Sequence, residues 1–145
     1  MSDRVDAPIP QGKYLPAVRH ADLIYTSGMT PRRGGALMFS GRMRAGDPLE
    51  SHRDAVRLAT QNALTAAQAN VAEGERIAVI VQLTVFLSTE PDFTAHSKVA
   101  DFASELLVEQ LGAGCIGSRA AIGVASLPAD APVEVTLIAA VVQRG

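Results

Sequence analysis

The stretch that decides the fold runs over residues 117–142 and reads GSRAAIGVASLPADAPVEVTLIAAVV. It contains two runs of mostly apolar residues, separated by a turn that lies between Pro128 and Pro132. Two strand-like runs around such a turn are typical of an antiparallel pair. The pattern therefore predicts that residues 117–128 and 132–142 form neighbouring strands that pair directly.

Each run carries one charged side chain near its start, Arg119 in the first and Glu134 in the second. Alternation along a strand places Arg119 on the same face as Ala121 and Gly123, which have almost no side chain. An unpaired buried charge is costly, so the two charges need an explanation. In a hairpin they would lie on a diagonal, roughly 7–8 Å apart at the backbone. That distance suits a salt bridge or a small molecule held between them, and a solvated edge is a further alternative.

A resemblance to a known family follows from these residues. The run SRAAIGVASLP at 118–128, followed by PVEV at 132–135, resembles the C-terminal signature of the RidA/YjgF family of enamine and imine deaminases. That signature is an arginine, a short run that ends in Leu-Pro, and a glutamate just after a valine. Tyr14 and the run IYTSG at 24–28 resemble the family's other signature. The resemblance covers nearly the whole chain, and one domain over residues 1–145 is expected.

The resemblance implies a fold and an assembly. Members of the family have an α+β, chorismate-mutase-like fold, in which a mixed β-sheet carries two helices on one face. They assemble as homotrimers with clefts between neighbouring subunits. The many Ala and Val residues of this chain agree with an apolar surface that another subunit covers.

The resemblance also implies an activity. The family's substrates are 2-aminoacrylate and related 2-imino acids, and hydrolytic deamination gives a 2-oxo acid and ammonia without a cofactor or metal. By resemblance Arg119 binds the substrate carboxylate, for which its planar fork is suited. Glu134 would activate water or transfer protons on the departing ammonia. Tyr14, Ser27 and Gly28 would line the cleft.

Three departures from the family pattern leave a second function open. Ala121 stands where better-known members have a cysteine, and the segment Asp92–Lys98 lacks the asparagine that familiar deaminases carry there. The loop Thr30–Gly46, rich in Arg and Gly, is also longer than the family version. The alternative is therefore a non-catalytic module of the same trimeric fold that binds a small carboxylate metabolite or another protein.

The rest of the chain predicts two helices, three further strands and a short hairpin. Asp47, Pro48 and Glu50 are typical of a capped helix start, and the helix should run to about Val71, with Gly74 as its stop. Residues 89–92 should open the second helix. The expected strands lie at 14–20 on an edge, at 23–29, in a short hairpin through 36–40, and at 77–87 in the sheet interior.

Composition excludes several classes of function. Of the 145 residues 48% are hydrophobic and 19% charged, which is typical of one folded domain. A net charge of −2, a sequence pI near 5.9 and 4% aromatic residues argue against nucleic-acid binding, including the ribonuclease activity with which family members have been labelled. No segment has the length or composition of a membrane span or a signal peptide, so the chain is expected in the cytoplasm.

The remaining reactive residues carry no motif. Cys115 is a single cysteine, which rules out an internal disulfide and a cysteine metal cluster. His20, His52 and His96 lack metal-ligand spacing, and no metal is expected. The arginines of the loop Thr30–Gly46 come without a phosphate-binding motif, so we interpret the loop mainly as solvated. An alternative is that one of them faces the ligand cleft.

Overall fold

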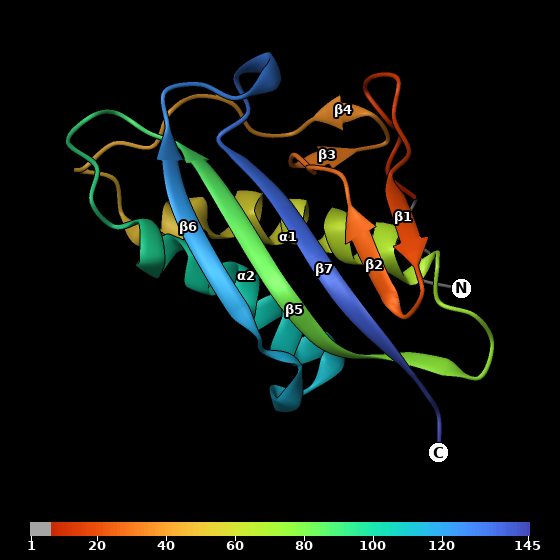
Figure 1. Cartoon of the computed structure of the whole chain (residues 1–145). Helices are drawn as coiled ribbons and strands as arrows, with labels where there is room; N and C mark the ends of the chain where they lie inside the picture. The colour runs from red at the N-terminus through yellow and green to blue at the C-terminus, as the bar shows by residue number, and fades with distance from the viewer. Residues whose placement is uncertain (1–6) are drawn as a thin grey trace, which may run out of the picture.

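Residues 7–145 are described by a computed structural model, in which a five-stranded sheet carries two helices on one face (Figure 1). The sheet order is β1-β2-β7-β5-β6, and only the β5–β6 pair is parallel. This arrangement confirms the predicted α+β class, with a mixed sheet and its helices on one side. The strands are β1 Ala17–His20, β2 Leu23–Thr26, β3 Arg32–Arg33, β4 Ala36–Leu37, β5 Glu75–Ser88, β6 Ser118–Val124 and β7 Val133–Gln143; the helices are η1 Leu49–His52, α1 Arg53–Gln68, α2 His96–Leu111, η2 Ala113–Cys115 and η3 Pro128–Asp130.

The predicted hairpin between residues 117–128 and 132–142 was wrong. Strand β5 lies between β6 and β7, parallel to the first and antiparallel to the second. The physical reason is that β5 is 14 residues long and largely apolar, so it can pair along both edges. The chain leaves β5 through α2, and this crossover places β6 on the far side of β5. The prediction that residues 77–87 form an interior strand is confirmed.

Both helices start later than their sequences predicted. The Asp47 carboxylate accepts a hydrogen bond from the Arg44 amide at 2.8 Å and caps no helix. A 3₁₀ turn precedes α1, which ends at Gln68; Gly74 then turns the chain into β5 with φ +84°.

The second start differs in the same way. The expected start at residues 89–92 is a turn closed by the Phe93 amide, which donates to the Glu90 carbonyl at 3.1 Å. Helix α2 therefore begins only at His96.

The shorter predicted strands agree with the structure in type and differ in length. Strand β1 begins after Pro16 and lies on an edge, as expected. Beyond β2, Met29 forms an isolated bridge with Val135, so the chain continues along β7. The hairpin expected through residues 36–40 consists of the two-residue strands β3 and β4.

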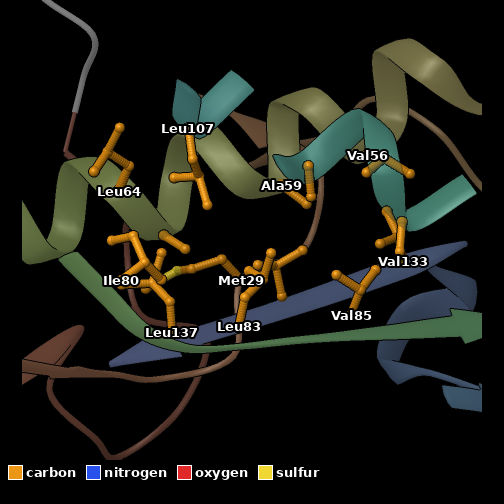
Figure 2. Close-up of a cluster of buried hydrophobic side chains, with 14 of the residues drawn as sticks. Met29, Val56, Ala59, Leu64, Ile80, Leu83, Val85, Leu107, Val133 and Leu137 are labelled. Carbon is orange, nitrogen blue, oxygen red and sulfur yellow. The ribbon is translucent and has the colours of Figure 1, made fainter. Parts of the chain in front are cut away.

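The core fills the space between the helices and the sheet. Figure 2 shows Val56, Ala59 and Leu64 of α1 and Leu107 of α2 packed over β5 and β7. Most of the buried positions of α1 are alanines, whose small side chains let the helix lie close to the strands. The sheet residues labelled in Figure 2 are Ile80, Leu83, Val85, Val133 and Leu137, all less than 5% exposed.

The opposite face of the sheet carries no helix (Figure 1). Its strands present apolar side chains to solvent there: Val18 is 51% exposed, Tyr25 42%, Ile122 41% and Val142 39%. We call this surface, defined by these four residues, the open face. Large apolar side chains gathered on one sheet face are typical of a surface that a partner covers.

None of the helices among the described residues is long and apolar enough to cross a membrane.

An ion pair ties the edge strand β1 to the turn between α1 and β5. Arg19 donates from Nη1 to Glu75 Oε1 at 2.6 Å and from Nη2 to Oε2 at 2.8 Å. The Ala72 amide also donates to Glu75 Oε1, at 2.8 Å. These hydrogen bonds, the one from Arg19 foremost, lower the pKa of Glu75 to about 2. The charged carboxylate is therefore favoured by the folded state.

We predict that Glu75→Gln lowers the melting temperature by several degrees at neutral pH. Because the pKa of Glu75 is lower in the folded chain than in the unfolded one, its contribution is complete above about pH 5. It should disappear as the pH falls toward 2, so the melting curves of wild type and variant should converge there. Glu109→Gln, which removes an exposed partner of Arg57, is the control and should have a smaller effect. A difference that stays constant from pH 7 to pH 2 would contradict the assignment.

Candidate functional site

The Glu134 side chain lies against Gly28 of the neighbouring segment, in the space that a side chain at this position would fill. Main-chain hydrogen bonds of 2.8 Å in both directions between Met29 and Val135 hold Gly28 beside β7. A Cβ atom at Gly28 would lie 2.6 Å from Glu134 Oε2, so only glycine leaves room for this carboxylate. Burial raises the pKa of Glu134, and no described residue donates a hydrogen bond to its carboxylate. A half-buried carboxylate with a raised pKa and no such partner is typical of a group that can exchange protons with a ligand.

Tyr14 and Ser27 lie in the same region. The Ser27 hydroxyl donates to the Leu15 carbonyl at 2.6 Å, and the Tyr14 hydroxyl accepts from the Gln11 amide at 3.1 Å. Tyr14 and Gly28 line a pocket of about 290 Å³ that also reaches Arg32 and Asn62. Gly28 thus connects the pocket that it shares with Tyr14 to the Glu134 carboxylate, and Ser27 precedes Gly28 in the chain. We call Tyr14, Ser27, Gly28 and Glu134 the glutamate half-site.

Arg119 lies on the other side of the sheet. It pairs with the buried Leu83 and extends over the helix-facing side, whereas Glu134 pairs with Phe86 on the open face. The two charges therefore form no salt bridge within the chain. The structure does not bring Arg119 together with the glutamate half-site, which overturns the expected proximity of the two side chains in a hairpin.

Helix α2 holds the Arg119 guanidinium. Nη1 donates to Asp101 Oδ1 at 2.8 Å and to Ser104 Oγ at 3.0 Å. Nη2 donates to the carbonyl and hydroxyl oxygens of Ser97, at 3.2 and 2.9 Å. No described residue accepts from Nε. The Nε–H is therefore the part of the fork that remains available to a ligand, since both terminal nitrogens already donate to residues of α2.

An open pocket adjoins the guanidinium. Its lining consists of Thr94, His96, Ser97, Arg119, Ala121, Ile122 and Gly123. We call Arg119, Ala121, Gly123, His96 and Ser97 the arginine half-site. Because Ala121 and Gly123 project almost nothing from the strand, the space beside Arg119 stays empty of side chains from β6. No group of His, Cys, Asp and Glu among residues 7–145 is arranged to hold a metal ion.

Comparison with known proteins identifies the family. The endoribonuclease L-PSP family matches residues 4–141. The chain belongs to this family, which is the RidA/YjgF family that the sequence resembles. Protein TCP17 of Trypanosoma cruzi is 30% identical over 131 residues, which cover 89% of this chain and 81% of that protein.

Two solved structures show how far the fold is shared. Atu1372 of Agrobacterium tumefaciens, a protein of unknown function, is 29% identical with a TM-score of 0.80, over 94% of this chain and 86% of that one. TdcF of Escherichia coli, solved with bound serine, is 22% identical with a TM-score of 0.64, over 95% of each chain. At such identities the RidA/YjgF fold is shared, whereas the activity of this member is a separate question.

Sequence analysis missed the residues of α2 that hold Arg119. Ser97, Asp101 and Ser104 are spaced by four and three positions, which places them on one face of a helix. The sequence therefore indicated a polar stripe beside the apolar face of the helix. It did not indicate that Arg119 binds this stripe. His96 was considered only for metal binding, for which its spacing is unsuited, and its contact with Gly123 depends on tertiary packing.

We predict that Gly28→Ala displaces the Glu134 carboxylate. The new methyl group would overlap this side chain, and we expect a loss of about 1–3 kcal/mol in the free energy of unfolding. Gly46→Ala is the matched control, because no atom lies within 4 Å of a Cβ there, and its effect should stay within about 0.5 kcal/mol. Chemical denaturation measures both. Equal stability of the two variants would argue against the contact between Gly28 and Glu134.

Proposed function

We propose that this chain is a cofactor-free hydrolytic deaminase of reactive 2-imino acids, such as the imine form of 2-aminoacrylate. Its products would be a 2-oxo acid and ammonia. The active site would lie between protomers of a homotrimer, where the arginine half-site of one protomer meets the glutamate half-site of the next. The observation that carries the proposal is the division of the predicted site residues between two faces of one sheet. A second copy of the chain would complete a site that is divided in this way.

Arg119 would bind the substrate carboxylate through Nε, and through Nη2 if the carboxylate replaces one of its two partners in Ser97. The new charge-assisted hydrogen bond from Nε would contribute roughly 1.5–3 kcal/mol, and the exchange at Nη2 would contribute less because a bond to Ser97 is lost. The bonds to Ser97, Asp101 and Ser104 already fix the direction of the guanidinium. Substrate binding therefore has little side-chain entropy to remove. The serine bound to TdcF supports a small amino-acid-like ligand for this fold.

Glu134 would transfer the protons of the reaction. As water attacks the imine carbon, the carboxylate accepts a proton and a C–O bond forms. With the imine bound in its protonated form, Glu134 passes this proton to the nitrogen, and the C–N bond of the resulting ammonium group breaks to release ammonia. As the carbonyl forms, the hydroxyl proton passes to Glu134 and from there to the ammonia, which leaves as ammonium and restores the carboxylate. The raised pKa of the buried carboxylate brings it closer to the neutral range in which such transfers are efficient. The atoms balance with water alone, so the proposal needs no metal or cofactor.

A second function is favoured by two observations. All the terminal nitrogens of Arg119 already have partners in α2, and Ala121 supplies no thiol. A module that binds small 2-oxo acids without turnover would use the same arginine half-site. The two functions differ in catalysis, since both require Arg119 for ligand binding.

Arg119→Lys should test the deaminase. The imine is generated by an amino-acid oxidase and trapped with semicarbazide, and an active protein lowers the amount of semicarbazone. Lysine keeps the charge and loses the fork, so kcat/KM should fall about 10- to 100-fold, as expected for the loss of one charge-assisted hydrogen bond. Arg57→Lys is the matched control, because Arg57 binds Glu109 outside both half-sites and its replacement should leave the rate unchanged.

The same assay separates the two functions. Imine loss no faster than in buffer would reject the deaminase. If 2-oxo acids then raise the melting temperature of the wild type and not of Arg119→Lys, the binding module is the better description.

We further predict that the open face forms the trimer contacts. Light scattering should give the wild type three times the mass of the 15.2 kDa chain. Tyr25→Glu places a charge on the open face and should shift the protein toward the monomer, with deaminase activity lost in parallel. Met38→Glu adds the same charge at an exposed apolar residue outside the open face and should remain trimeric. A monomeric wild type would exclude the shared site.

A further inference from the structure

The imidazole of His96 occupies the space where Gly123 has no side chain. A Cβ atom at Gly123 would collide with His96 Nε2 and lie 3.2 Å from Thr89 Oγ1. Gly123 does not have the positive φ that favours glycine at other positions of this chain. Its backbone therefore gives no conformational reason for glycine. The reason lies in packing, because Gly123 makes room for the His96 ring.

Contact with Phe93 also fixes the orientation of the His96 ring. His96 is the first residue of α2, and its imidazole meets the buried Phe93 ring edge to face, with centroids 5.1 Å apart and an interplanar angle of 81°. This geometry is favourable for aromatic pairs and limits rotation of the side chain. No described residue forms a hydrogen bond with the His96 ring. Its nitrogens are thus oriented and remain able to bind a ligand.

His96 and Arg119 line the same pocket. Arg119, Ala121 and Gly123 share one face of β6, at steps of about 6.6 Å, and His96 stands over the last of them. A small 2-imino acid whose carboxylate binds Arg119 would extend over Ala121. The substituent on its β-carbon would then point toward His96.

We propose that His96 is a specificity-determining residue, which selects 2-imino acids that carry a hydroxyl group on the β-carbon over those that carry an alkyl group. This inference rests on the proposed function. A neutral imidazole has one donor and one acceptor, and a hydroxyl group can satisfy either. A methyl group at the same place would leave the imidazole without a partner. Sites built to bind a hydroxyl discriminate against analogues that lack it for this reason.

Two substrates that differ by one group test the proposal. The imines of serine and 2-aminobutyrate, produced by a D-amino-acid oxidase from the D-amino acids, carry a hydroxyl and a methyl group at the same place. Wild type should favour the serine imine in kcat/KM. His96→Val should lower that preference about tenfold, mainly through the serine imine, and His96→Gln should restore part of it.

Gly123 provides an independent variant. Gly123→Ala should displace the imidazole and reduce the preference as His96→Val does. Gly114→Ala, where no atom lies within 4 Å of a Cβ, is the matched control and should keep the wild-type preference. Melting curves show whether each variant is folded. A Gly123→Ala protein that is folded and keeps the full preference would overturn the role of the His96–Gly123 contact.

Failure of this inference can be distinguished from failure of the deaminase function. If wild type hydrolyses both imines and His96→Val has the same preference, the role of His96 is wrong and the deaminase stands. If wild type hydrolyses neither, the deaminase function is wrong. Calorimetric binding of hydroxypyruvate and 2-oxobutanoate then decides about His96. Equal affinities, or a difference that His96→Val does not reduce, would overturn its role in selection.

Discussion

The pairing of β5 along both of its edges determines where every site residue lies. Side chains that are paired across neighbouring strands share a face, and the next residue along each strand lies on the other face. Through β5, Arg119 is in register with Leu83, and Glu134 with Phe86. Leu83 lies in the core under the helices, while Phe86 belongs to the other face. Leu83 and Phe86 are three positions apart on β5 and so lie on opposite faces. Arg119 and Glu134, which pair with them, are therefore on opposite faces of the sheet.

The separation agrees with the distribution of apolar surface. A sheet with helices on one side leaves its other face uncovered, and here that face carries Tyr25, Ile122 and Val142. Glu134 lies on the same side as these residues, whereas Arg119 lies at the edge formed by β6 and α2. Contact between the open face of one copy and the β6 edge of another would bury apolar surface and bring the two charges together. Assembly and completion of the site would then have one cause.

The sequence could predict the layers better than their connections. Alternation in β5 and the apolar repeats of the helices indicated their types, because those patterns follow from burial within each element. The order of strands depends on which edges meet, and a Pro-bounded turn between β6 and β7 is equally compatible with a hairpin and with strands separated by β5. The cap expected at Asp47 failed because the Arg44 amide binds its carboxylate. Side chains that compete for one polar partner are not visible in local spacing.

In the candidate site too, contacts between residues far apart in the chain could not be predicted from local spacing. Arg119 and Glu134 were identified through the family signature, and their roles stay predictions. The importance of Gly28, Ala121 and Gly123 is of another kind, since each matters through the side chain it lacks. At Gly28 the missing Cβ admits a carboxylate, and at Gly123 it admits an imidazole. Between Arg119 and His96, Ala121 leaves the space that a ligand would occupy. The shape of both half-sites therefore depends on small residues, one just after β2 and two within β6, and in this way backbone packing is connected with the selection of a ligand.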